Sequence, residues 1–328
     1  MKILRIFIAL FFIALPIAAR NMWFYDGKYE PDTQVEIPDY DELTIPQPEI
    51  SSIEDVENNL RDEADAPIVL FDFSHDNYFS FSEIDTLIEL LTDKGAKIEI
   101  ATDPGFLEMQ LKYADSYVVI APTYYFSVEE IKVITKFVDS GGHLMVIADP
   151  TRNYDDYYYY ESVAVITATD LANMVLAPFD IRFKKDYVYN LSVNEGNFRN
   201  VIFNKFSESR FTKDLEEIVL YGAHSIETDQ IPLIMGDTST FSSLTDQGGD
   251  LTTAASGNDD RVLAIGDINF MTTPYSQVST NYKFIENIAE FLVSEEREPD
   301  LSNFPYIFTR PVVLLNADGR VIKQDFLE

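Results

Sequence analysis

The stretch ADSYVVIAPTYYFSVEEIKVITKFVDSGGHLMVIADPTR (114–152) decides the fold. It places an apolar strand at 116–122 before an amphipathic helix that begins with a capping box at Ser127. A second apolar strand, at 143–149, follows the pair Gly141-Gly142. Glycine ends a helix readily because it adopts the left-handed conformation without a Cβ clash. A strand, a helix and a strand in this order predict a unit of an α/β sheet.

The same alternation continues on both sides of this stretch. Before it we expect a strand at 68–73, a helix at 83–94 and a strand at 96–101, and after it a strand at 261–267 and a helix at 282–293. Together they predict one α/β domain over residues 67–294, with a mainly parallel, three-layer, flavodoxin-like sheet.

The region between these outer elements is less periodic. A short helix is expected at 169–176 and a strand at 181–189, followed by strand-like patches at 201–203, 217–222 and 232–236. The run of Ser, Thr, Gly and Asp from Thr238 to Asp260 predicts an exposed loop.

The two ends of the chain differ from the domain in composition. Residues 1–25 combine a basic start with the apolar run Ile6–Ala19, which predicts a signal peptide or, alternatively, a retained N-terminal membrane anchor. Both interpretations place the protein outside the cytoplasm, with membrane contact only through this segment. Residues 26–66 predict an acidic, proline-containing stalk, and residues 295–328 a C-terminal extension with a β-hairpin at 312–324.

The composition excludes several classes of function. The 328 residues carry 56 acidic and 24 basic side chains, a net charge of -32, which repels nucleic acid phosphates. The absence of cysteine excludes thiolate catalysis, disulfides and cysteine-bound zinc. The three histidines lack the spacing of a metal site, and no dinucleotide, P-loop or esterase motif is present. We therefore expect no metal, no cofactor and no nucleic acid partner.

Polar side chains follow the strands where ligands of open α/β sheets gather. Asp149 could be a carboxylate nucleophile or metal ligand, with Asp72, His75 and Asp267 as available partners. The favoured interpretation is a turn cap, because Asp-Pro commonly opens a turn, and Arg152 could pair with this aspartate. The run Tyr157–Tyr160 suits recognition of a protein or glycan, or packing of its loop, and both interpretations remain open.

Three blocks carry a resemblance to a known family: LFDFSHDN (70–77), the stretch 114–152, and RVLAIGDINFM (261–271) with the helix after it. Over residues 67–294 the chain resembles the domain of unknown function 4350. It is similar to accessory proteins of gliding-motility-type ABC transporters and to the non-catalytic branch of the class I glutamine amidotransferase-like fold.

The resemblance implies that the chemistry of catalytic members has been lost. Asp149 stands where those enzymes carry a cysteine, and the oxyanion turn would fall at Pro122-Thr123-Tyr124, where both glycines are missing. A cleft inherited from this fold would be lined by residues of the strand ends: Asp72, Ser74, His75, Pro122, Thr123, Tyr124, Asp149, Arg152, Asp267 and Asn269.

These observations predict an exported or membrane-tethered, non-catalytic α/β domain that binds a partner protein or a small ligand. The resemblance makes subunits of an ABC-type transport system the expected partner. The first alternative is a hydrolase that uses Asp72, Asp149 and Asp267 with a divalent cation such as Mg²⁺ or Ca²⁺. The second is a surface protein with a purely structural role, whose sheet carries no ligand.

Overall fold

The computed structural model describes residues 11–20, 22, 66–152 and 168–294, and the backbone of the strands at 314–315 and 321–322. The chain divides into two units, Met1–Val56 and Glu57–Glu328. Residues 11–20 are helical. Within the described residues no helix has the length and apolar character needed to cross a membrane. The predicted stalk and most of the predicted signal segment lie outside the described residues.

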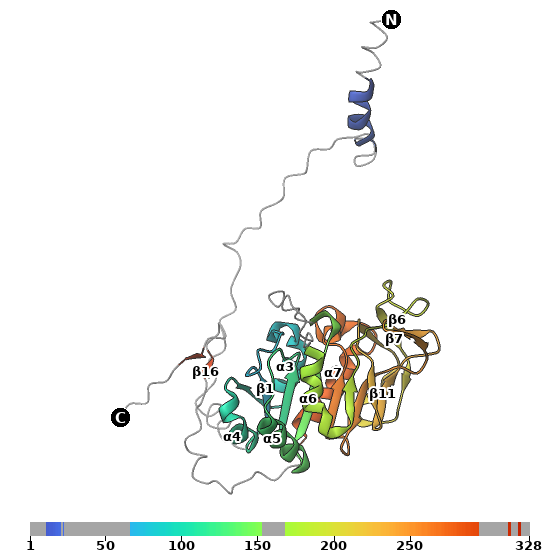
Figure 1. The fold of residues 1–328 in the computed structure, drawn as a ribbon. Helices are drawn as coiled ribbons and strands as arrows, with labels where there is room; N and C mark the ends of the chain where they lie inside the picture. Colours follow the sequence, from blue (N-terminus) through green and yellow to red (C-terminus); the bar gives the residue numbers. More distant parts are fainter. Residues whose placement is uncertain are drawn as a thin grey trace, which may run out of the picture. The chain divides into compact units, whose positions relative to one another are not determined.

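A ten-stranded mixed sheet forms the body of the second unit (Figure 1). Its parallel half has the order β2-β1-β3-β4-β15. These strands are β1 (Ile68–Asp72), β2 (Lys97–Ala101), β3 (Ser116–Ile120), β4 (His143–Ile147) and β15 (Val262–Ile265). This order is that of the flavodoxin-like sheet, so the predicted fold class is confirmed.

Helices cover both faces of the parallel half. The helices are α3 (Asp85–Asp93) and α7 (Asn281–Val293) on one face, and α4 (Leu107–Leu111), α5 (Val128–Asp139) and α6 (Ala168–Leu176) on the other. Side chains alternate between the two layers along each strand: Val69 and Phe71 pack with α3 and α7, whereas Leu70 packs on the opposite side. Burial on both faces explains why these strands are nearly continuous apolar runs.

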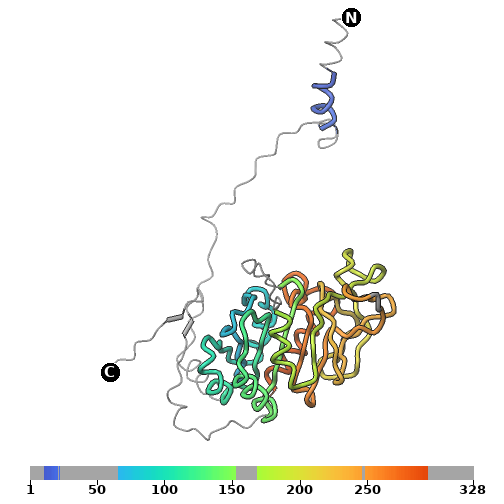
Figure 2. Tube along the Cα trace, in the orientation of Figure 1, coloured from blue at the N-terminus to red at the C-terminus, as the bar shows by residue number. Residues whose placement is uncertain are grey.

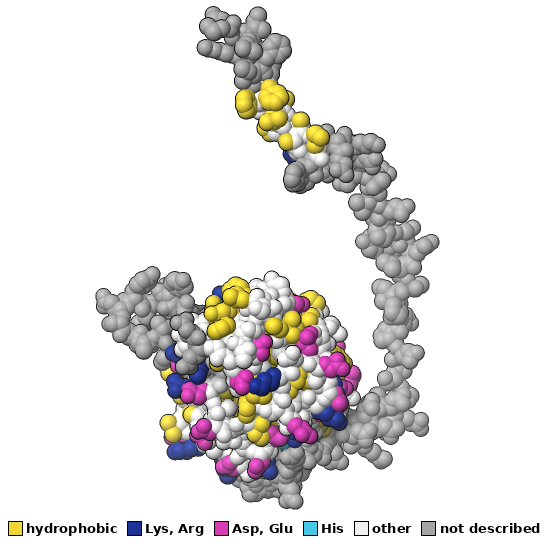
Figure 3. Space-filling view, turned by 90° about the vertical axis from the view of Figure 1, so that its right-hand side faces the viewer, with side chains coloured by type: hydrophobic (Ala, Val, Ile, Leu, Met, Phe, Trp, Pro, Cys, Tyr) yellow, Lys and Arg dark blue, Asp and Glu magenta, His cyan; other side chains and the backbone are white. Residues whose placement is uncertain are grey.

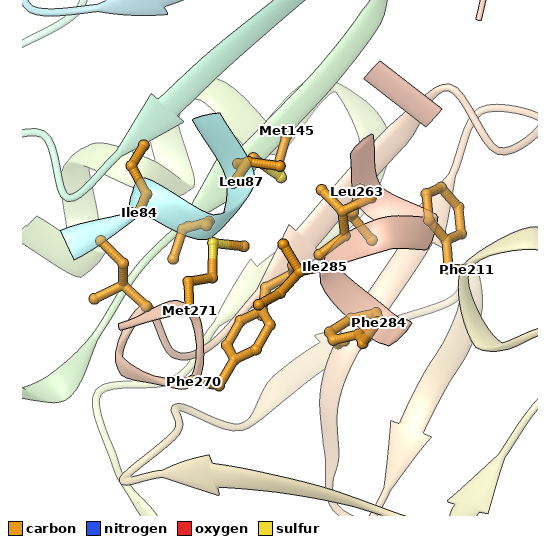
Figure 4. Packing of buried hydrophobic residues seen from close by; sticks show 14 of the residues in the cluster. Ile84, Leu87, Met145, Phe211, Leu263, Phe270, Met271, Phe284 and Ile285 are labelled. Carbon is orange, nitrogen blue, oxygen red and sulfur yellow. The ribbon is translucent and has the colours of Figure 1, made fainter. Parts of the chain in front are cut away.

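The layer between the sheet and the pair α3–α7 is filled by large side chains (Figure 4). Ile84 and Leu87 from the α3 side, Ile285 of α7 and Met145 of β4 all belong to this layer, and Leu87 lies next to Met145 in the view. Each such side chain contributes about 1.5–3 kcal/mol when it is fully buried. The amphipathic helices of the sequence are therefore held by packing rather than by their own propensity.

The turn between α5 and β4 has the form predicted from Gly141-Gly142. The amide of Gly141 donates to the carbonyl of Val138 and that of Gly142 to the carbonyl of Phe137, both at 3.0 Å. With Gly141 at φ +98°, this is a Schellman motif. The capping box at the other end of α5 is also present, between Ser127 and Glu130.

The second half of the sheet is antiparallel. It continues from β15 through β14 (Thr252–Gly257) and β10 (Ile226–Thr228) to β5 (Ile181–Phe183), while β11 (Ile231–Met235) pairs with β14 and with β8 (Lys205–Phe206). Smaller sheets are made by β6 (Val188–Asn190), β12 (Thr240–Ser242) and β13 (Thr245–Gly248), and by β7 (Asn200–Phe203) and β9 (Ile218–Tyr221). The expected strand at 181–189 is thus two strands in different sheets.

The predicted exposed loop from Thr238 to Asp260 is wrong. This segment contains β12, β13 and β14, and β14 is a buried strand between β15 and β10. The sequence of β14, TTAASG, has only small side chains, so it lacks the bulky apolar residues by which buried strands are recognised.

β15, the last strand of the parallel half, borders the antiparallel half through β14, and α7 follows it on the face that α3 also covers. In Figure 2 the chain runs from the blue and green parallel half into the yellow antiparallel half, and its orange to red part, which ends in α7, returns to the middle of the domain. Near the C-terminus, β16 (Leu314–Leu315) and β17 (Val321–Ile322) pair antiparallel, within the segment where a hairpin is expected. They form a two-stranded sheet of their own.

Gly266 allows the two halves to approach closely just after β15. Its carbonyl accepts the amide of His224 at 2.8 Å, and its own amide donates to the carbonyl of Thr253 at 2.9 Å. A Cβ at this position would lie 2.3 Å from the backbone oxygen of His224. Only glycine fits, because the contact is with backbone that cannot rotate away.

Gly266→Ala is expected to lower the free energy of unfolding by about 3 kcal/mol, because the added methyl group forces two paired backbone segments apart. Urea denaturation of the full chain, followed by circular dichroism, measures the loss. Gly105→Ala is the control, since its nearest neighbour is the flexible carboxylate of Asp103 at 3.2 Å. Equal losses for both variants would show that the close approach at Gly266 does not constrain the fold.

Candidate functional site

Aspartates occupy the carboxyl ends of three parallel strands. Asp72 is the last residue of β1, and Asp149 and Asp267 each stand two residues beyond the ends of β4 and β15. All three side chains are buried, so they are built into the edge of the sheet. They fall into two groups, which we call the His75 cluster (Asp72, Ser74, His75 and Glu130) and the aspartate pair (Asp149 and Asp267).

The His75 cluster holds one imidazole between two carboxylates. Nδ1 of His75 lies 2.9 Å from Oδ2 of Asp72, and Nε2 lies 3.1 Å from Oε1 of Glu130. Oγ of Ser74 donates to Oδ1 of Asp72 at 2.7 Å. The His75 ring also stacks on Phe126, with centroids 3.6 Å apart. The imidazole is thus buried, oriented and held from three sides.

Glu130 reaches His75 because the capping box has already fixed its side chain. Oε2 of Glu130 accepts the amide of Ser127 at 2.7 Å, which leaves Oε1 for the imidazole. Glu130 was not among the candidate residues predicted from the sequence. Its capping role was readable, but its contact with a histidine 55 positions away was not.

Tyr117 lies in the core beside the same cluster. Its burial, followed by the negative charge of Asp72, raises the pKa of the phenol well above its usual range. The side chain therefore stays neutral and serves as packing on the α5 face.

The turn that corresponds to the predicted oxyanion loop is already occupied. The amides of Thr123 and Tyr124 both donate to the carbonyl oxygen of His75, at 2.9 and 3.0 Å. Oγ1 of Thr123 donates to the carbonyl of Asp76 at 2.6 Å, and Pro122 is buried. In this conformation neither amide is available to stabilise an oxyanion.

Asp149 caps the turn that follows β4. Its Oδ1 accepts the amide of Thr151 at 2.6 Å and the hydroxyl of the same residue at 2.5 Å, while Oδ2 accepts the amide of Ile268 at 3.0 Å. The turn cap predicted from Asp-Pro is therefore present. The same carboxylate also ties the end of β4 to the segment after β15.

Asn269 joins Asp149 to Asp267. Its Nδ2 lies 2.8 Å from Oδ2 of Asp149 and 3.0 Å from Oδ1 of Asp267. Asp267 also accepts the amide of Tyr221 at 2.7 Å and that of Asn269 at 2.9 Å. Burial and the nearby charge of Asp149 together raise the pKa of Asp267 well above its usual range. Asp267 therefore releases its proton less readily than an exposed aspartate.

The expected pairing of Arg152 with Asp149 is wrong. The guanidinium instead bonds Glu83, and its carbon lies 5.8 Å from the ring centroid of Tyr78. Burial alone would raise the pKa of Glu83, but the bonds from Arg152 and Ser80 outweigh it and lower that pKa. Asp149 does not pair with the guanidinium of Arg152, because backbone and hydroxyl donors already satisfy both of its oxygens.

The three aspartates are bonded in two separate groups. Asp72 bonds His75, whereas Asp149 and Asp267 share Asn269. Across the described part of the chain, no group of three or more Asp, Glu or His side chains has an arrangement that could hold a metal ion. The polar candidates that reach the surface are Ser74, Thr123, Tyr124, Arg152 and Asn269.

The other two histidines are also buried. Nδ1 of His224 donates to the carbonyl of Asp186 at 2.5 Å, and Nε2 lies 3.1 Å from Oγ1 of Thr169. Desolvation lowers the pKa of His224, so it serves as a neutral hydrogen-bonding residue in its loop. His143 packs against Phe291 of α7 at the start of β4. The tyrosine run Tyr157–Tyr160 lies outside the described residues.

The antiparallel end carries a hollow that the sequence did not indicate. A volume of about 390 Å³ lies between Tyr187, Tyr189, Leu191, Phe198 and Leu244. The guanidinium carbon of Arg199 stacks 4.3 Å from the ring centroid of Tyr187. Figure 3 faces this end of the molecule, where hydrophobic side chains gather in patches near the top and charges of both signs are interspersed below.

Comparison with known proteins adds information on the fold. No protein-family model matches the chain, and no curated protein matches it. The solved mmIFT52 N-terminal domain is similar in structure, with 13% sequence identity and a TM-score of 0.53 over 70% of this chain and 99% of that domain. At this identity the likeness shows a shared fold and nothing of function.

Two further structures are more distant. A ThuA-like protein from Bacteroides uniformis ATCC 8492 has 14% identity and a TM-score of 0.42, over 72% of this chain and 96% of its own. A polyextremophilic β-galactosidase from the Antarctic haloarchaeon Halorubrum lacusprofundi has 8% identity and a TM-score of 0.40, over 70% of this chain and 30% of its own.

His75→Ala is expected to lower the free energy of unfolding by about 3–5 kcal/mol, because it leaves two carboxylates without their partner, one of them fully buried. Ser74→Ala removes a single hydroxyl donor from the same Asp72 and should cost at most about 1.5 kcal/mol. Denaturant unfolding of both variants measures the difference. Similar losses would mean that the imidazole is a spacer rather than the centre of the cluster.

The raised pKa of Asp267 makes stability depend on pH. Below the unfolded pKa the carboxyl is protonated in both states, whereas above it only the unfolded state ionises. Stability should therefore fall as pH rises from about 4 through the folded pKa, by at most about 1.4 kcal/mol per pH unit. Asp267→Asn should flatten this slope in unfolding measurements from pH 4 to 8, and the exposed control Glu227→Gln should not. An unchanged slope would exclude Asp267 as its source.

Proposed function

We propose that the chain is an extracytoplasmic, non-catalytic α/β domain that binds a protein partner and acts as an accessory to an ABC-type transport system. The observation that carries this proposal is that the groups which catalysis would need at the strand ends are already hydrogen-bonded within the domain. The amides of the would-be oxyanion turn are bonded to His75, and Asp149 is saturated by backbone and hydroxyl donors. The loops at the edge of the sheet are thus bonded to one another and to the buried side chains.

The sequence supports the cellular side of the proposal. The basic and apolar N-terminal segment favours export or tethering, and the acidic stretch that follows is suited to a stalk. The resemblance to domain of unknown function 4350 connects the chain with accessory proteins of ABC transporters. Membership of that group is part of the proposal, and so is the choice of partner.

The aspartate pair favours a second candidate, a hydrolase. Two neighbouring carboxyl groups with a raised pKa on one of them are the arrangement from which general acid and base pairs are built. This function requires a substrate to reach side chains that are buried in the described structure. It would use Asp149 and Asp267 without Asp72.

The first proposal predicts that an ABC permease and an ATPase are encoded beside this gene. Co-expression of the full chain with these subunits tests it. We expect a stoichiometric complex in size-exclusion chromatography, and we expect Asp149→Asn to leave complex formation unchanged once circular dichroism confirms that the variant is folded. A turnover of ester, amide or phosphoester substrates that Asp149→Asn abolishes would overturn the proposal in favour of the hydrolase. Absence of a complex with these subunits would overturn the transporter assignment.

A further inference from the structure

An exposed aromatic surface lies directly on the loops that the His75 cluster holds. It consists of Tyr78, Tyr124, Tyr125 and Val128, which we call the strand-end tyrosine patch. These side chains are exposed by 53%, 58%, 52% and 62%. Large side chains gathered at such exposure are uncommon away from interaction sites.

Backbone hydrogen bonds bring the members of the patch together from two loops. The amide of Tyr78 donates to the carbonyl of Ala121 at 2.9 Å, and that of Tyr124 to the carbonyl of His75 at 3.0 Å. The rings of Tyr124 and Tyr125 meet edge to face, with centroids 6.3 Å apart. The loops are therefore fixed before any partner arrives, which lowers the entropy lost on binding.

Carboxylates accompany the exposed rings. Asp76 and Glu129 are both exposed, the first two residues before Tyr78 and the second next to Val128 at the start of α5. The chain as a whole carries a net charge of -32. A segment with negative charge would be repelled, and a purely apolar one would desolvate these carboxylates without pairing them.

The same edge already holds one guanidinium in this manner. Arg152 lies over the ring of Tyr78, with its carbon 5.8 Å from the centroid, while Glu83 pairs its charge. Arginine combines stacking on an aromatic face with bonds to a carboxylate, because its guanidinium is planar and weakly hydrated. The exposed tyrosines and carboxylates offer the same combination to a second chain.

We propose that the strand-end tyrosine patch binds an arginine-rich, cationic segment of the partner protein. This inference rests on the proposed function, since it names the surface and the chemistry of the partner that the domain binds. Tyr124 and Tyr125 supply stacking faces, and Asp76 and Glu129 supply the charges. Tyrosine contacts of this kind are frequent among the residues that dominate the binding energy of interfaces.

A fluorescein-labelled peptide of nine arginines, titrated into the full chain and followed by anisotropy, tests the patch. The double variant Tyr124→Ala/Tyr125→Ala should weaken binding by about tenfold although the net charge is unchanged. Tyr282→Ala is the matched control, because Tyr282 is an exposed tyrosine on α7, 43% accessible. The affinity of the Tyr282→Ala variant for the peptide should stay within about twofold of that of the unmodified chain.

A second pair of variants separates local from general electrostatics. Asp76→Asn/Glu129→Gln and Glu227→Gln/Asp229→Asn each remove two exposed negative charges, the first pair at the patch and the second near β10. We expect the first pair to weaken peptide binding several-fold more than the second. Asparagine suits position 76, whose backbone has φ +48°.

Equal affinities for all these variants would overturn the inference, because the peptide would then be responding only to the net charge. Equal binding of an uncharged peptide of the same length would also overturn it. The outcome is separable from that of the proposed function. If the patch variants weaken peptide binding but the chain hydrolyses a substrate through Asp149, the patch is supported and the accessory role is overturned. If all variants bind the peptide equally but the chain forms the transporter complex, the patch is overturned and the accessory role is supported.

Discussion

The arrangement of the loops at the ends of the parallel strands depends on the carboxylates buried there. A buried carboxylate is costly unless hydrogen bonds satisfy its oxygens, and the loops that cross this edge supply those bonds. Asp149 accepts amides from its own turn and from the segment after β15, and Asp267 accepts one from β9. Each aspartate therefore joins elements that are distant in sequence. The hydrogen bonds that these carboxylates accept fix the positions of the loops.

The parallel half was predictable because its strands are buried on both faces and its helices on one. Burial of a strand on both faces produces a long apolar run, and burial of a helix on one face produces a 3.6-residue period of apolar residues. The strands at 68–73, 116–122 and 143–149 were therefore predicted with nearly their observed bounds. The antiparallel half was not predictable in the same way. Its strands are short, and β14 fills a narrow buried position with threonine, alanine and serine, residues that also dominate loops.

In the candidate site, contacts between sequence neighbours were predictable, and contacts between residues far apart in the sequence were not. The cap at Asp149 follows from an Asp-Pro sequence and needs only neighbouring residues. The contact of His75 with Glu130, and that of Arg152 with Glu83, join residues 55 and 69 positions apart, and one sequence contains no signal for either. The sequence predicted that Arg152 pairs with Asp149 across the Asp-Pro turn. In the fold, amide and hydroxyl donors satisfy Asp149, and Arg152 pairs with Glu83, the glutamate of the capping box at Ser80.

The position of β1 has a mechanical consequence. This strand is the first of the domain, and it lies between β2 and β3, bonded in parallel register to both. If the chain before Pro67 tethers the domain, a pull on the tether acts along β1, so that its ladder bonds to both neighbours are sheared together instead of opening one after another. A strand at the edge of the sheet would peel away under a smaller load. With such a tether, the sheet order would place the load on a strand that two neighbours hold.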